Sequence, residues 1–312
     1  MKERLAVIAI GGNSLIKEKD RTSIEDQIKA VEETCKNIAD LVADGWNVVI
    51  THGNGPQVGF LMRRSELAAK EIPAIPLEIA VADTQGAIGY MIQQALINEF
   101  HNRGINKPVV TVVTRVLVDG SDPAFANPTK PIGSFMTREK ALEMAEKNGW
   151  KIAEDAGRGW RRVVPSPEPQ KILEDSAIQD LISKGYAVVC VGGGGIPVIE
   201  KDGKYEGVSA VIDKDYASSL LARTVGADAF IVTTGVSKVA INFGKSDQRE
   251  LDRLTVEEAT TYLKEGHFPP GSMGPKMEAI LNYLKSSKGE GIITSPEELL
   301  AAVKGKSGTC IR

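Results

Sequence analysis

Short apolar segments recur along this chain, several of them followed by glycine within two residues, and this pattern constrains its fold more than any other feature. Residues 5–10 form an uninterrupted apolar run followed by Gly11 and Gly12. Further apolar runs lie at 47–51, 108–113, 187–191, 229–233 and 291–294. Uninterrupted runs of this kind are typical of strands buried on both faces, as in parallel sheets. We therefore expect a mostly parallel central sheet.

Amphipathic helices separate these segments. The best example spans 24–41, where apolar side chains recur at spacings of three and four and mark one face of a helix that ends at Asp44 and Gly45. Further helices are expected near 56–67, 78–102, 137–148, 215–225 and 275–285, with another starting at 295–298. Strands that alternate with helices predict an α/β fold, a three-layer αβα sandwich that spans 1–312 as one domain.

Residues 119–170 interrupt this alternation. They contain six of the fifteen prolines, which are Pro123, Pro128, Pro131, Pro165, Pro167 and Pro169. Only 137–148 resembles a helix within the segment. Excursions of this length often carry function, so we expect a small protruding subdomain, or lid, over the active site. A surface excursion without a role is the alternative.

The composition of the chain limits the kinds of partner and metal that we expect it to bind. The net charge of −3 gives no reason to expect nucleic acid or an anionic membrane. Three widely spaced cysteines favour free thiols in a reducing cytoplasm. Three scattered histidines have no metal-ligand spacing, so a zinc site is not expected, and the sequence identifies no metal ligands.

Glycine-rich turns follow three of the predicted strands. They are Gly11-Gly12-Asn13-Ser14, Gly53-Asn54-Gly55 and the four glycines at 192–195. Glycine lets backbone N–H groups approach a ligand closely, and the N-terminus of a following helix adds its partial positive charge. Such turns can therefore bind phosphate. A tight connection without a ligand is the alternative for each turn. The chain has neither a Walker A motif nor a dinucleotide fingerprint, which disfavours a NAD-binding Rossmann enzyme.

Three lysines lie in loops suited to phosphate chemistry. They are Lys130, Lys214 and Lys276, and Asp213 and Asp215 flank the second of them. The carboxylates would keep Lys214 charged and fix its direction. Phosphoryl transfer depends on positioning and on compensation of phosphate charge, which lysines provide. Each lysine taken alone could equally be a solvated surface charge.

Seven collinear segments resemble those of carbamate kinases in the amino acid kinase superfamily. They lie at 10–13, 51–59, 127–133, 161–167, 192–197, 211–215 and 270–276, and the third and fourth are the most specific. The resemblance implies the reaction ATP + carbamate ⇌ ADP + carbamoyl phosphate, with Mg²⁺. It also implies a homodimer, and turnover toward ATP in arginine fermentation.

The resemblance also assigns roles to residues. Lys130, Lys214, Lys276, Asp213 and Asp215 would be catalytic; Gly11, Gly12, Asn13, Ser14, Gly53, Asn54 and Gly55 would bind the phosphoryl group and carbamate; and Gly235, Val236, Lys238, Val239, Met273, Gly274 and Pro275 would bind the nucleotide. Superfamily kinases usually carry a lysine where this chain has Ala9, and Lys130 would replace it. Ser237 stands where relatives commonly carry an acid.

Two alternatives remain at this point. A kinase of the same fold could act on another small carboxylate or on a phosphonate. A nucleotide-binding module without catalysis is the other possibility, although the complete set of lysines and acidic partners disfavours it.

Overall fold

An eight-stranded sheet forms the centre of the molecule. The computed structural model describes residues 3–12, 23–155 and 159–312. The strands are ordered β15-β17-β16-β12-β1-β2-β9-β3, and every pairing is parallel except that of β16 with β17. Their bounds are β1 Arg4–Ile10, β2 Trp46–His52, β3 Val109–Thr111, β9 Ala187–Val189, β12 Ala229–Thr233, β15 Arg253–Leu254, β16 Glu290–Thr294 and β17 Thr309–Ile311.

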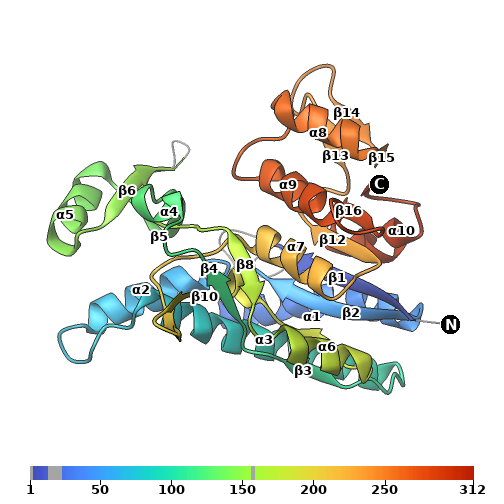
Figure 1. The fold of residues 1–312 in the computed structure, drawn as a ribbon, viewed down its shortest axis with the longest axis horizontal. Helices are drawn as coiled ribbons and strands as arrows, with labels where there is room; N and C mark the ends of the chain where they lie inside the picture. The colour runs from blue at the N-terminus through green and yellow to red at the C-terminus, as the bar shows by residue number, and fades with distance from the viewer. Residues whose placement is uncertain (1–2, 13–22, 156–158) are drawn as a thin grey trace.

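Helices cover both faces of this sheet (Figure 1). Strand β1 shows why, because Val7 and Ala9 pack into one buried cluster while Ile8 and Ile10 pack into another. The first cluster includes α6 Asp175–Ser183, α7 Lys214–Thr224, α8 Val256–Lys264 and α9 Met273–Leu284. The second includes α1 Ile24–Ala43, α3 Leu77–Asn102 and α10 Leu299–Val303. The chain is therefore apolar on both sides of each central strand, as the sequence predicts.

Smaller sheets flank this core. One has the order β11-β10-β4-β8, formed by β4 Arg115–Val118, β8 Pro169–Ile172, β10 Ile196–Lys201 and β11 Lys204–Gly207. A hairpin joins β13 Val239–Ile241 to β14 Arg249–Leu251. Two 3₁₀ helices, η2 Gly192–Gly194 and η3 Pro296–Glu298, also lie in the described part of the chain.

A separate antiparallel sheet, with the order β5-β7-β6, stands away from the core next to α2 Gln57–Ala68 (Figure 1, green). Its strands are β5 Lys130–Met136, β6 Lys151–Glu154 and β7 Trp160–Val164. Helix α5 Arg138–Asn148 connects β5 to β6, and the short helix α4 Pro123–Ala126 precedes the sheet. We call residues 130–164 the lid. Its root is packed, because Ile132 and Val164 join a buried cluster with Val58 of α2 and Val81 of α3.

The predicted fold class is confirmed, and most predicted elements agree with the structure within a few residues. The three-stranded sheet of the lid was not predicted, because its strands mix buried, half-buried and exposed residues and lack a clear apolar pattern. The helix expected at Ser295 begins as η3, without a side-chain cap. The boundary at 119–170 stays a prediction. Within the described part of the chain, no helix has the length and apolarity needed to span a bilayer.

Candidate active site

Two lysines meet at one buried carboxylate. Asp215 is 4% exposed and lies in the first turn of α7. Its Oδ1 accepts from Lys214 Nζ at 2.6 Å, and its Oδ2 accepts from Lys276 Nζ at 3.0 Å. Lys214 begins α7 and Lys276 lies in the first turn of α9, so two neighbouring helices bring these charges together. The two lysines and the carboxylate carry a net positive charge.

The charges of this cluster are strongly coupled. Burial acts to raise the pKa of Asp215, but the charges and hydrogen bonds of Lys214 and Lys276 outweigh it and hold this pKa below its usual range. Burial, together with the nearby charge of Lys214, lowers the pKa of Lys276. A positive site of this kind is suited to an incoming polyphosphate, whose negative charge would relieve the repulsion between the lysines.

Lys130 reaches the same region from the lid. Its Nζ donates to Asp213 Oδ2 at 2.6 Å. The other oxygen of Asp213 caps α7 by accepting from the backbone N–H of Asp215 at 2.9 Å. One carboxylate thus fixes a helix start and holds the lid lysine. The structure therefore brings the predicted lysines and aspartates into one continuous network.

The first glycine turn lies beside β12. The N–H of Gly11 donates to Thr233 Oγ1 at 3.2 Å, and a Cβ at this position would lie 2.9 Å from the Thr233 carbonyl oxygen. Gly11 is therefore required for close approach of the two strand ends. Gly12 is exposed, and among the described residues no atom lies within 4 Å of the place that a Cβ would take there. The predicted residues Asn13 and Ser14 lie outside the described residues.

The second glycine turn passes under Lys214. A Cβ on Gly53 would lie 3.0 Å from Lys214 Cδ, so a larger residue would force the lysine side chain to shift from its path across the turn. Gly55 has φ +52°, the left-handed conformation that glycine adopts readily. The predicted turn at Gly53, Asn54 and Gly55 therefore adjoins the lysine cluster.

Asn54 presents a buried donor in this turn. Its Oδ1 accepts from Thr84 Oγ1 at 2.6 Å, which fixes the orientation of the amide. Its Nδ2 is buried and has no hydrogen-bond partner among the described residues. A buried donor without a partner is costly, and a bound anion would satisfy it. The geometry therefore favours a small acceptor at Asn54.

The four-glycine turn supports the second turn by close packing. A Cβ on Gly193 would lie 2.0 Å from Asn54 Oδ1, and one on Gly192 would lie 2.4 Å from His52 Nε2. Gln85 of α3 adds a further link by donating to the carbonyl of Gly192 at 2.9 Å. These glycines let the loops touch and thereby position Asn54.

The predicted nucleotide residues fall into two groups. Met273, Gly274 and Pro275 open α9 directly before Lys276. Gly235, Val236 and Ser237 are exposed after β12. Lys238 Nζ pairs with Asp252 at 2.6 Å, and Val239 is fully buried with its N–H on Thr309 Oγ1 at 2.8 Å. The first group adjoins the lysine cluster, whereas the recorded bonds of Lys238 and Val239 lead to other elements.

The described part of the site presents lysine side chains rather than a set of metal ligands. Among the described residues, no three His, Cys, Asp or Glu side chains form a group that could hold a metal ion. Both oxygens of Asp215 and both of Asp213 already accept hydrogen bonds. The residues fit Mg²⁺ that is bound mainly by nucleotide phosphates and enters with them.

Several polar residues that support the site were not singled out from the sequence. Thr84 and Gln85 are buried on α3, and Thr51 Oγ1 lies 2.6 Å from Ser218 Oγ across β2 and α7. Adjacent polar residues inside the long apolar pattern of α3 were the available signal, because polar side chains are seldom buried without partners.

His52 predicts a pH dependence of stability. It is 1% exposed at the end of β2, and its neutral ring bonds the Gly53 carbonyl through Nδ1 at 2.9 Å. Burial lowers its pKa from 6.5 to about 4. Below 6.5 the unfolded chain therefore binds a proton that the native state resists, and stability falls as the pH drops from 6.5 to about 4.

The full effect of His52 corresponds to about 3 kcal/mol. Urea unfolding of the wild type and of His52→Gln across this pH range measures it. The stability advantage of the wild type should shrink as the pH falls. A constant difference between the two proteins would contradict the buried neutral histidine.

Comparison with known proteins identifies the family. The model of the amino acid kinase family matches residues 4–295. The chain belongs to the amino acid kinase family. Among relatives of this kinase chain, a protein named carbamate kinase from Thermococcus kodakarensis is 50% identical, with 97% of each chain covered. A carbamate kinase-like protein, YahI of Escherichia coli, is 52% identical over 100% of this chain and 99% of its own.

Solved structures agree with this assignment of the amino acid kinase chain. A carbamate kinase from Giardia lamblia bound to AMP-PNP superposes with a TM-score of 0.92 at 43% identity, covering 99% of this chain and 98% of its own. A protein from Aeropyrum pernix K1 superposes with a TM-score of 0.94 at 46% identity, covering 99% of each chain. The predicted resemblance to carbamate kinases is confirmed over nearly the whole length.

Proposed function

We propose that this chain is a carbamate kinase that catalyses ATP + carbamate ⇌ ADP + carbamoyl phosphate. The observation that carries the proposal is the contact of the lid lysine Lys130 with Asp213, next to the cluster of Lys214, Lys276 and Asp215. The lid would thus supply a cation that Ala9 of β1 does not.

 Ala9 itself is apolar and fully buried in the core, so β1 offers no charge at that position.

The roles of the residues follow from their positions. Lys130, Lys214 and Lys276 would neutralise the phosphates, while Asp213 and Asp215 hold the lysines in place. The backbone of Gly11 and Gly12 would bind the transferring phosphoryl group, and the sequence places Asn13 and Ser14 next to them. Gly53, Asn54 and Gly55 would bind carbamate, with Asn54 Nδ2 donating to it. These turns present backbone N–H groups and one amide donor, which suits a very small planar anion.

The nucleotide would lie against α9 and the segment after β12. Met273, Gly274 and Pro275 are positioned for this because they lead into Lys276. Gly235 and Val236 would complete the enclosure, with Lys238 and Val239 behind them. The AMP-PNP named for the Giardia relative supports ATP and ADP as the nucleotides. Mg²⁺ would bind mainly to the phosphates and add charge compensation to that of the lysines.

ATP formation from ADP and carbamoyl phosphate tests this function most directly. A luciferase-coupled assay should show Mg²⁺-dependent ATP formation, and the reverse reaction should consume ATP when ammonium bicarbonate supplies carbamate. Turnover toward ATP is the direction we propose in the cell. Acetyl phosphate is the matched control phosphodonor. Activity with another small acid but not with carbamate would favour a different kinase of this fold, and ADP binding without any turnover would favour a regulatory module.

A second copy of the chain is the proposed partner. Helix α3 exposes Ile79, Tyr90 and Ile97 on one side, with fractional exposures of 47%, 63% and 41%. Apolar side chains gathered on one helix face support a homodimer that buries them. Sedimentation velocity should give twice the mass of one chain, and Tyr90→Asp should shift the protein toward monomer.

The free thiols, two of them buried, support a cytoplasmic location.

A further inference from the structure

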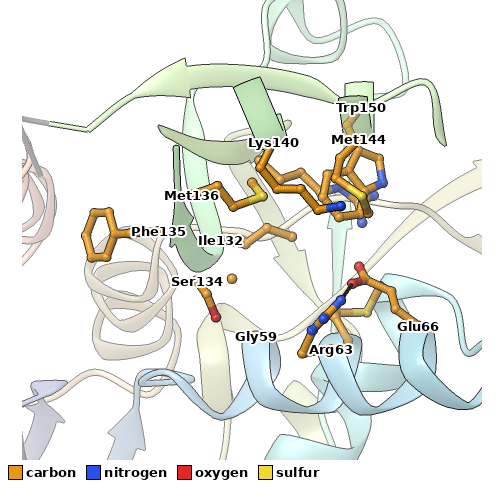
Figure 2. A pocket seen from close by; sticks show the side chains of 13 residues that line it. Gly59, Arg63, Glu66, Ile132, Ser134, Phe135, Met136, Lys140, Met144 and Trp150 are labelled. Atoms are coloured by element: carbon orange, nitrogen blue, oxygen red, sulfur yellow. Dashed lines mark hydrogen bonds and ion pairs between the residues drawn. The ribbon is translucent and has the colours of Figure 1, made fainter. Parts of the chain in front are cut away.

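A cavity lies between the lid and α2, and the residues of the lysine cluster do not line it. It has a volume of about 220 Å³ and is lined from above by the lid and from below by α2 (Figure 2). Arg63 and Glu66 of α2 face Lys140, Met144 and Trp150 of the lid across this cavity. The assigned roles of the lysines, glycine turns and nucleotide residues do not use it.

The walls of this cavity are mostly apolar and adaptable. The apolar lining consists of Met62, Ile132, Phe135, Met136, Met144 and Trp150. Methionine side chains fit irregular ligands because they are unbranched and polarizable. A pocket of this kind, with few polar groups, is typical of a small-molecule site. The size suits a molecule of about one aromatic ring with a short substituent.

One cation in this pocket has no anion bound to it. Arg162 lies over the ring of Trp150, with 5.1 Å between its Cζ and the ring centroid. Within the described residues, its guanidinium forms no hydrogen bond or ion pair. Burial lowers the pKa of Arg162, although the charge of Glu66 acts in the opposite direction. Arg162 is therefore a partly desolvated guanidinium that faces an apolar cavity.

The other charged groups of the lining are already paired. Arg63 pairs with Glu66 at 3.5 Å, and Lys140 pairs with Glu143 at 2.8 Å. A planar carboxylate matches the fork of a guanidinium, and an apolar body would fill the space against the methionines. A phosphate would need further donors, and the other cations of the lining, Arg63 and Lys140, already pair with Glu66 and Glu143.

We propose that this cavity binds a small apolar carboxylate, held by Arg162 through its carboxylate and by the methionines and Trp150 through its apolar part. The cavity is present while Lys130 of the same lid contacts Asp213. A ligand that binds this arrangement stabilises it relative to any other, because a ligand shifts an equilibrium by its differential affinity. Its occupant therefore holds the lid against α2.

The packing at the root of the lid explains how this effect reaches the lysine. Ile132 lines the cavity and lies two residues after Lys130 on β5. Gly133 touches α2, since a Cβ on Gly59 would lie 2.8 Å from the Cα of Gly133. A molecule in the cavity thus contacts the strand that carries Lys130.

Binding of phenylacetate tests the proposal. Calorimetry on the full chain should show saturable binding to the wild type, with binding weakened about tenfold or more in Arg162→Gln, because a hydrogen-bonded charge is removed. Phenylacetamide is the matched neutral ligand, and acetate is the ligand without the apolar body; both should bind far more weakly. Arg138→Gln, which removes another lid arginine near an aromatic ring, is the matched control variant and should retain binding.

Hydrogen exchange distinguishes this site from the active site. Phenylacetate should slow exchange in residues 130–164 and in α2, and ADP with carbamoyl phosphate should not displace it. Met144→Trp, which fills the cavity without changing charge, should also abolish binding and so provides a second test if Arg162→Gln fails to fold. Displacement by ADP, or equal binding by wild type and both cavity variants, would overturn the proposal. Because these experiments measure binding, their outcome for the proposed carboxylate site does not depend on whether the chain has carbamate kinase activity.

Discussion

Replacing Lys130 with alanine is expected to lower kcat by about 10²- to 10³-fold while leaving the fold intact. Among the described residues of the lid, Lys130 is the one whose side chain pairs with Asp213. Its charge would matter most when negative charge builds up on the transferring group, so kcat should fall more than KM rises. The measurement is steady-state ATP formation from ADP and carbamoyl phosphate.

The matched control for this change is Lys151→Ala. Lys151 is an exposed lysine on β6 of the same lid, so its loss removes one lid charge without touching Asp213. It should retain close to wild-type turnover. Near-normal activity of Lys130→Ala would remove the lid lysine from the mechanism, and an equal loss in both variants would indicate a general effect of lid charge.

Asp215→Asn is expected to destabilise the fold as well as to abolish most activity. The carboxylate is buried and accepts hydrogen bonds from Lys214 and Lys276, so its neutralisation leaves two nearby ammonium groups without an anion. Breaking a buried ion pair by removing one partner costs about 3–5 kcal/mol. Urea unfolding without nucleotide measures this loss, and added ADP should recover part of it because phosphates replace the missing charge.

Asp252→Asn is the matched control for stability. Asp252 also pairs with a lysine, Lys238, at 2.6 Å, but its side chain is 78% exposed. Exposed ion pairs contribute at most about 1 kcal/mol, so this variant should unfold close to the wild type. A loss in Asp215→Asn no larger than in the control would contradict a tightly coupled buried cluster.

The sequence predicted the central fold well because its signals are local. Residues 5–10 and 229–233 read as buried strands and are the neighbouring strands β1 and β12. The lid sheet gave no such signal, since its strands mix buried, half-buried and exposed residues without a regular alternation. Its antiparallel pairing depends on contacts between residues distant in sequence, such as Lys130 with Val164, which periodicity does not encode.

The site was predicted in its residue types but not in its connections. Lysines in glycine-rich loops could be picked out by chemistry, whereas the link from Lys130 to Asp213 spans 83 residues and exists only in the folded chain. The same holds for the support of Asn54 by Thr84 and Gly193. For Lys238, the motif predicted a contact with the nucleotide, and in the structure its side chain pairs with Asp252.

The divided role of Asp213 has a consequence for the timing of turnover. One oxygen holds the first turn of α7 and the other holds Lys130, so release of the lysine leaves the helix cap in place. Lys130 is 33% exposed, and a pair at such a surface contributes only about 1 kcal/mol. Opening of this ion pair therefore leaves in place the helix that carries Lys214. We expect products to leave when Lys130 moves away, while Lys214 and Lys276 stay bound to Asp215.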